Sequence, residues 1–253
     1  FVRGGRHERA VLALVVCVAL ALWLGGHFAL ARTPHMGVGP RIDIALVSTQ
    51  ESVRFSSISM QEDAAALGAM LSILPATRGA DIIVFPEGSN FLRRFRARAP
   101  ASAEDLLRSL YAGTTSPVII TSGSSYTQGG ALRLRTEVYE VATGDSLFQD
   151  KRFLLPDGEY MPEYARALIS ATGKGKFLDA AYTYRTFTPG DDIRPLAATS
   201  TSIAVLFCNE AMSPYLYASL ARQGARIFIN AASQAWFHGS RRVEDQMRSI
   251  ATV

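Results

Sequence analysis

Cysteine, histidine and clustered charge are all scarce in this 253-residue sequence. The four histidines are scattered and show none of the spacing of metal ligands, so we expect no metal site and no cofactor: they are His7, His27, His35 and His238. The net charge of +4 includes no long basic run, which argues against nucleic-acid binding. No internal repeat is visible, and the composition is typical of one globular core with an additional apolar segment.

That apolar segment is residues 10–31, which contain no Asp, Glu, Lys or Arg. At 1.5 Å per residue this run is long enough for a helix to cross a hydrocarbon core of about 30 Å, so we predict a transmembrane helix. The alternative is a cleaved signal peptide, because Ala29-Leu30-Ala31 has the small-x-small pattern of a cleavage site. In either case the arginines at positions 3, 6 and 9 place the amino end in the cytoplasm and the rest of the chain outside it.

The only two cysteines are Cys17 and Cys208. Because Cys17 lies in the predicted membrane segment, it cannot pair with Cys208 in an outer domain. Cys208 is therefore expected to be a lone thiol in an oxidising compartment, either a reactive group or an inert buried cysteine.

Beyond a Pro- and Gly-containing linker, residues 32–41, the pattern is that of an α/β domain. Apolar and alternating runs predict strands over residues 41–50, 81–85, 117–123, 131–141, 146–152, 202–208 and 226–230. Helical spacing predicts helices over residues 62–74, 102–111, 161–168 and 214–223. A further strand is expected near residues 182–187, and a helix over residues 241–253. This order indicates a mixed sheet covered by helices.

Three of these strands end close to an ionisable residue: Glu87, Lys151 and Cys208. Open α/β sheets place reactive groups at such ends. A thiol must lose its proton before it attacks a carbonyl, and a carboxylate can take that proton and later return it. A lysine can stabilise first the thiolate and then the oxyanion, assisted by the backbone N–H of Asn209. Taken singly, each of the three also has an ordinary reading as a buried thiol, a loop carboxylate or a solvated lysine.

Four motifs in this order resemble the nitrilase, or carbon–nitrogen hydrolase, superfamily, and within it the apolipoprotein N-acyltransferases. They are Pro86-Glu87 after a buried strand, the Lys-x-x-Leu-x-Pro-x-Gly-Glu-Tyr-x-Pro run from Lys151, Cys208-x-Glu210, and RQGARIFINAASQAWF ending in Phe237. The sequence departs from these acyltransferases at Phe85, at Asn209 and at His238-Gly239-Ser240. We also expect a fragment, because the chain begins at Phe1 and ends before the strands and final membrane helix of such enzymes.

The resemblance implies a four-layer α-β-β-α sandwich over residues 42–253, truncated at its carboxyl end and preceded by a cytoplasmic flank (1–9) and the transmembrane helix. It also implies a bacterial inner-membrane enzyme whose catalytic domain is extracytoplasmic. In this reading Cys208 takes a fatty acyl group from a phospholipid as a thioester, and passes it to the N-terminal amine of a lipidated apolipoprotein. Glu87 is then the base, Lys151 the electrostatic stabiliser and Cys208 the nucleophile.

Further residues are expected near this site, each with an ordinary alternative. The resemblance implies that Glu159 orients Lys151 or the substrate, although the sequence fits a turn carboxylate equally well. Glu210 is either a pocket residue or a cap for a helix starting near Ser213. Trp236 and Phe237 are either an acyl-pocket wall or core aromatics. Residues 91–95, next to Glu87, suit a lid on anionic lipid headgroups or an amphipathic surface helix.

Two other functions remain open from the sequence. One is an amidase or nitrilase that uses the same three residues with water as acceptor, for which neither the membrane helix nor the apolar loop is needed. The other is a catalytically inactive relative that binds lipid or lipoprotein. Formation of a thioester on Cys208 distinguishes the enzyme from the binding protein.

Overall fold

The computed structural model describes residues 6–32, 41–49, 59–127, 129–156, 158–173, 186–198, 201–233 and 245. The chain divides into two units, residues 1–41 and 42–253, and each is treated by itself below.

The first unit contains a single long helix, α1 (Arg6–Arg32), which covers the apolar segment. Its large apolar side chains are exposed along the whole helix: Val11 near its start is 61% exposed and Phe28 near its end is 64% exposed. Of the helices that the structure describes, none has the combined length and apolar composition needed to span a bilayer. The predicted helix is therefore present, and its transmembrane character is not confirmed.

The second unit is built on a five-stranded sheet in the order β1-β2-β3-β4-β5. Its strands are β1 (Ile44–Leu46), β2 (Ile82–Val84), β3 (Val118–Tyr126), β4 (Leu132–Glu140) and β5 (Ser146–Asp150). The first three strands are parallel, and β3, β4 and β5 pair antiparallel. The sheet is therefore mixed, as the sequence predicted.

Helices cover one face of this sheet. They are α2 (Met60–Ile73), followed by the 3-10 helix η1 (Leu74–Thr77), α3 (Phe91–Arg98) and α4 (Ala103–Leu110). Ile83 and Phe85 point into the core that these helices close, whereas Ile82 and Val84 point to the opposite face. Every residue of β2 is buried because the strand is covered on both faces, which explains its continuous apolar sequence.

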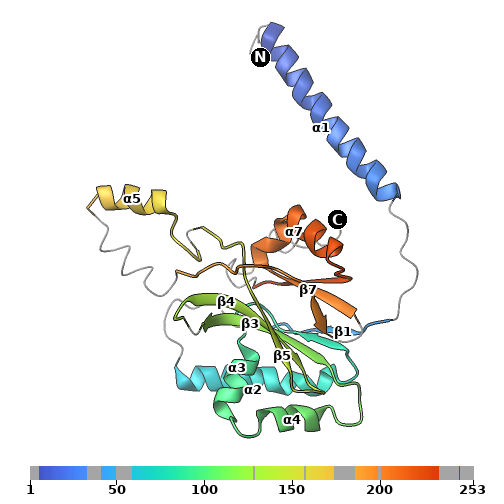
Figure 1. The fold of residues 1–253 in the computed structure, drawn as a ribbon, viewed down its shortest axis with the longest axis vertical. Coiled ribbons are helices and arrows are strands. Elements are labelled where there is room, and N and C mark those ends of the chain that lie inside the picture. The colour runs from blue at the N-terminus through green and yellow to red at the C-terminus, as the bar shows by residue number, and fades with distance from the viewer. Residues whose placement is uncertain are drawn as a thin grey trace. The chain divides into compact units, whose positions relative to one another are not determined.

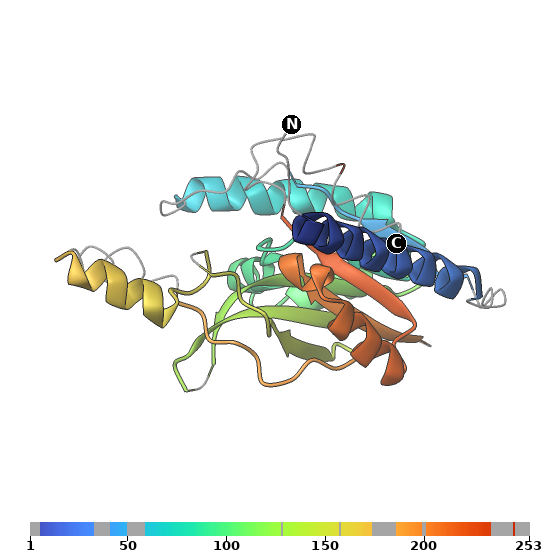
Figure 2. The same ribbon diagram turned by 90° about the horizontal axis from the view of Figure 1, so that it is seen from above.

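The opposite face packs against a second sheet, in the order β6-β7-β8. Its strands are β6 (Leu196–Ala198), β7 (Thr201–Phe207) and β8 (Ile227–Ala231), and β7 pairs parallel with β8. Ile203 and Val205 join the core between the sheets, and Ala204 and Leu206 pack against α7 (Pro214–Arg222). The layers are thus helix, sheet, sheet and helix, and the expected α-β-β-α sandwich is confirmed (Figures 1 and 2).

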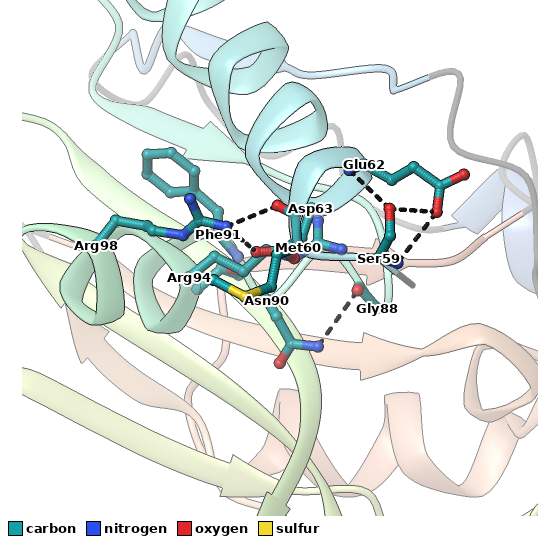
Figure 3. Close-up of polar contacts among 10 residues, drawn as sticks. Ser59, Met60, Glu62, Asp63, Gly88, Asn90, Phe91, Arg94 and Arg98 are labelled. Carbon is teal, nitrogen blue, oxygen red and sulfur yellow. Dashed lines mark hydrogen bonds and ion pairs between the residues drawn. The ribbon is translucent and has the colours of Figure 1, made fainter. Parts of the chain in front are cut away.

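Helix α3 does not have the structure expected of a lipid-facing lid. Its apolar residues Phe91, Leu92 and Phe95 are buried in the core under the first sheet. Two of its arginines bind Asp63 of α2: Arg94 Nε lies 2.9 Å and Arg98 Nη2 3.5 Å from that carboxylate (Figure 3). The helix is consequently a fixed amphipathic helix, the alternative that the sequence left open.

Several elements differ in extent from the prediction. β1 is three residues long rather than ten, β6 was not predicted, and α3 extends beyond the expected segment 91–95 to Arg98. The short helix after Met161 is α5 (Glu163–Ala171), none of whose residues is buried. The strand predicted near residues 182–187 and the helix over residues 241–253 fall almost wholly outside the described residues.

Candidate active site

Glu87 is held by a tight turn at the carboxyl end of β2. Gly88, with φ of 79°, makes this turn possible, and the Ser89 N–H closes it on the Pro86 carbonyl at 3.2 Å. The turn is fixed to the neighbouring strand β3, because the Asn90 N–H donates to the Ser122 carbonyl at 3.0 Å. The Glu87 side chain is thereby held with only 12% of its surface exposed.

Lys151 follows the last residue of β5, and its side chain is fully buried. Its Nζ atom lies 2.5 Å from Oε1 of Glu159 and 3.8 Å from Oε1 of Glu87. The other oxygen of Glu159 accepts the Leu155 N–H at 2.8 Å, so this carboxylate is itself held in place. A fully buried ammonium is tolerable only with such partners, and here two carboxylates face one lysine.

Cys208 stands where β7 ends and the 3-10 helix η2 (Cys208–Met212) begins. Its φ of 40° lies in the left-handed region, which residues other than glycine rarely adopt. Strained backbone of this kind is concentrated at functional sites. The Cys208 thiol interacts with the Glu87 carboxylate, so the structure brings Glu87, Lys151, Glu159 and Cys208 together.

Glu210 is completely buried and joins the two segments that carry Lys151 and Cys208. Its Oε1 atom accepts the N–H groups of Arg152 and Phe153 at 2.8 and 3.0 Å. Its Oε2 atom accepts the N–H of Phe207 at 2.9 Å. The alternative role as cap of the following helix is wrong, because Ser213 itself accepts the Leu216 N–H at the start of α7.

Asn209 reinforces the same connection through its side chain, whose Nδ2 donates to the Phe153 carbonyl at 3.1 Å. Its backbone N–H interacts with the Cys208 thiol and lowers the pKa of that thiol. Trp236 and Phe237 lie outside the described residues, so their predicted place in an acyl pocket stays a prediction. One further interaction was not predicted, that of the Ser233 backbone with Glu87, because a main-chain donor has no residue signature.

Burial dominates the electrostatics of the site. It raises the pKa of Glu87, and the negative charge of Glu159 raises it further, against the opposing effects of Lys151 and of the hydrogen bonds from Ser233 and Cys208. Burial, with the nearby Glu87 carboxylate, also raises the pKa of the Cys208 thiol to about 11, although Lys151 acts in the other direction. The resting thiol is therefore protonated at neutral pH, and its activation requires a base in contact with it. Glu87 is a carboxylate in a position to interact with this thiol.

Three comparisons with known proteins bear on this arrangement. The family model for carbon–nitrogen hydrolase matches residues 54–252. An apolipoprotein N-acyltransferase of Geobacter metallireducens is 24% identical over 238 residues, which are 90% of this chain and 42% of that protein. The chain thus spans less than half the length of this relative.

Solved structures of the same superfamily share the fold. A carbon–nitrogen hydrolase from Helicobacter pylori G27 superimposes with a TM-score of 0.52 at 16% identity, covering 83% of this chain and 67% of that chain. Nit3 from Saccharomyces cerevisiae, a member of branch 10 of the nitrilase superfamily, gives a TM-score of 0.53 at 16% identity, with 83% and 71% covered. With the family match extending over most of its length, the chain belongs to the carbon–nitrogen hydrolase family.

Proposed function

We propose that the chain is a cysteine-dependent N-acyltransferase, in which Glu87, Lys151 and Cys208 move a fatty acyl group from a phospholipid to the N-terminal amine of a lipidated apolipoprotein. The observation that carries this proposal is the contact of the Cys208 thiol with a buried carboxylate that itself lies 3.8 Å from a buried ammonium. The likeness to the Geobacter acyltransferase supports the choice of reaction within the family.

In the first half-reaction Glu87 takes the proton of the Cys208 thiol as sulfur attacks the ester carbonyl carbon of the phospholipid. Lys151 and the Asn209 N–H stabilise the negative charge on the carbonyl oxygen. The bond between carbon and the leaving oxygen then breaks, and Glu87 returns the proton to that oxygen. The products are a thioester on Cys208 and a lysophospholipid.

In the second half-reaction the amine of the acceptor attacks the thioester carbon. Glu87 accepts a proton from the amine, and the carbon–sulfur bond breaks as an amide forms. Glu87 then returns this proton to the sulfur, so the site regains its starting state. Both steps use the same oxyanion stabilisation, which is why one site serves an ester donor and an amine acceptor.

Exposed apolar side chains close in sequence to the site residues favour a lipid donor over a small water-soluble amide. Phe153 and Leu155 lie between Lys151 and Glu159, and Met212 and Tyr215 follow Cys208 closely in the chain. Their exposed fractions range from 38% to 65%. Large apolar groups on a protein surface are typical of sites that bind lipid or another protein. We assign α1 the role of membrane anchor on the same grounds, since its apolar side chains are also exposed.

The test is intact-mass spectrometry of the chain after incubation with phosphatidylethanolamine vesicles. A fatty-acyl mass that hydroxylamine removes is expected on the parent protein and on Cys17→Ser, and it should be absent from Cys208→Ser. Adding a peptide with a diacylglyceryl-cysteine N-terminus should then discharge the thioester and acylate the peptide. Turnover of small amides without an acyl adduct would support the hydrolase instead, and neither activity would support a lipid-binding protein.

A further inference from the structure

A short extended segment, residues 186–193, crosses the part of the chain that carries Lys151 and Glu159; we call it the strap. The strap holds the main chain of both residues. The Phe187 N–H donates to the Glu159 carbonyl at 2.9 Å, and the Gly190 N–H donates to the Lys151 carbonyl at 2.7 Å. The two residues whose side chains form the buried ion pair are therefore fixed through their backbones by the same segment.

The strap is anchored on both sheets. Between its two contacts with the ion pair, the Thr188 N–H donates to the Leu132 carbonyl of β4 at 2.8 Å. At its far end Ile193 is buried with Ala204 and Leu206 of β7, the strand that leads to Cys208. A displacement of the strap would consequently change the position of Lys151 relative to the thiol.

Gly190 is buried, and it leaves no room for a side chain. A Cβ atom at this position would lie 2.6 Å from the Asp150 carbonyl oxygen and 2.9 Å from the Asp150 Cβ. Asp150 is not free to move away, because Arg135 binds its carboxylate at 2.6 and 3.0 Å. Arg133 adds a third contact at 3.2 Å. A side chain at position 190 would therefore push the strap outward.

We propose that Gly190 is a positioning residue, whose lack of a side chain lets the strap approach closely enough to hold Lys151 and Glu159 in register with Cys208. Its effect on turnover rests on the proposed function, whereas its effect on the surroundings of Cys208 does not. These two consequences are separable by experiment.

The experiment compares Gly190→Ala with Gly68→Ala, both in a Cys17→Ser background so that Cys208 is the only thiol. Gly68 lies in α2 with nothing within 4 Å of an added Cβ, which makes it a matched control. For each protein the rate of Cys208 alkylation by iodoacetamide is measured against pH, alongside thermal unfolding and acyl transfer. Alkylation reports the ionisation of the thiol whether or not the enzyme turns over.

Because the Lys151 charge lowers the pKa of the Cys208 thiol, its displacement in Gly190→Ala should move the alkylation midpoint to higher pH. The value of kcat/KM should fall by about 10- to 100-fold, the usual effect of misplacing a catalytic group by about 1 Å. Gly68→Ala should match the parent protein in both measurements. A folded Gly190→Ala protein with the parent's alkylation profile would overturn the proposal.

Two further outcomes keep the inference distinct from the proposed function. A shifted midpoint in a chain whose parent never forms an acyl adduct would support the positioning role and refute the acyltransferase. If Gly190→Ala does not fold, Phe187→Pro removes the N–H that holds the Glu159 carbonyl, with Phe187→Leu as the control that keeps it. An unshifted midpoint in folded Phe187→Pro would equally overturn the proposal.

Discussion

The Lys151 ammonium binds Glu159 at 2.5 Å, so the carboxylate nearest to the lysine is not the one that contacts the thiol. Glu87, the partner of Cys208, lies 3.8 Å from the same nitrogen atom. This arrangement separates two tasks. Glu159 compensates the buried positive charge, and Glu87 is the carboxylate to which we assign the proton exchange with Cys208.

Replacing Glu159 with Gln should shift the acidic limb of the pH–rate profile to lower pH. The negative charge of Glu159 raises the pKa of Glu87, so its removal lowers that pKa and keeps Glu87 ionised in more acidic solution. We also expect kcat to fall, because Lys151 loses its closest ionic partner. The measurement is kcat/KM against pH, and an acidic limb at the parent's position would contradict this role for Glu159.

Replacing Glu87 with Gln should make the Cys208 thiol more acidic while abolishing most of the activity. The Glu87 carboxylate contributes to the raised pKa of the thiol, so a neutral amide lowers that pKa. The same change removes the proposed general base, for which we expect a loss of about 10²- to 10⁴-fold in kcat. Alkylation and acyl transfer are measured on the same sample, and retained turnover would show that another group accepts the proton.

The thiol of the parent protein should titrate far above the range of an ordinary cysteine. Its pKa is raised from 9.0 to about 11, chiefly by burial. In a Cys17→Ser background the alkylation rate is therefore expected to reach half its maximum near pH 11, whereas the rate in urea-unfolded protein should reach half its maximum near pH 9 and level off about one pH unit higher. Equal midpoints for the folded and unfolded protein would show that burial does not affect this thiol.

Replacing Glu210 with Gln should lower the free energy of unfolding by about 2 kcal/mol or more, since hydrogen bonds to a charged group contribute roughly 1.5–3 kcal/mol each. The Gln side chain has only one acceptor oxygen. Its NH2 group must therefore face a backbone N–H that donates a hydrogen bond to the Glu210 carboxylate in the parent protein. Urea denaturation measures the change, with the exposed Glu163→Gln as control, for which we expect less than about 1 kcal/mol. Equal losses in the two variants would mean that Glu210 does not join the two segments.

The sequence was most informative for strands in which a continuous apolar run shows both where the strand lies and where it ends. The apolar runs of β2 and β7 are buried on both faces, so their positions follow from composition alone, and Glu87 and Cys208 were predicted directly after them. The pairing of Lys151 with Glu159, eight residues later, was expected only through the family resemblance, because a Glu in a turn has many possible partners.

The remaining contacts depend on segments that are distant in the chain. Glu210 accepts N–H groups 57 and 58 residues away, and backbone donors are not encoded by residue type. The burial of Phe91 and Phe95 depends on which face of α3 meets the first sheet, and an amphipathic composition next to Glu87 fitted a lipid-facing lid as well. The residue pattern indicated one mixed sheet; the second sheet followed from the resemblance.

The two groups in contact at the centre of the site come from different sheets. Glu87 follows a strand of the five-stranded sheet, and Cys208 follows a strand of the three-stranded sheet. Their contact exists only while the apolar core between the sheets is closed. An opening that parts the sheets would expose the thiol and remove the nearby Glu87 carboxylate, and both changes lower the pKa of Cys208. The pH at which Cys208 becomes reactive therefore reports whether the two sheets are packed together.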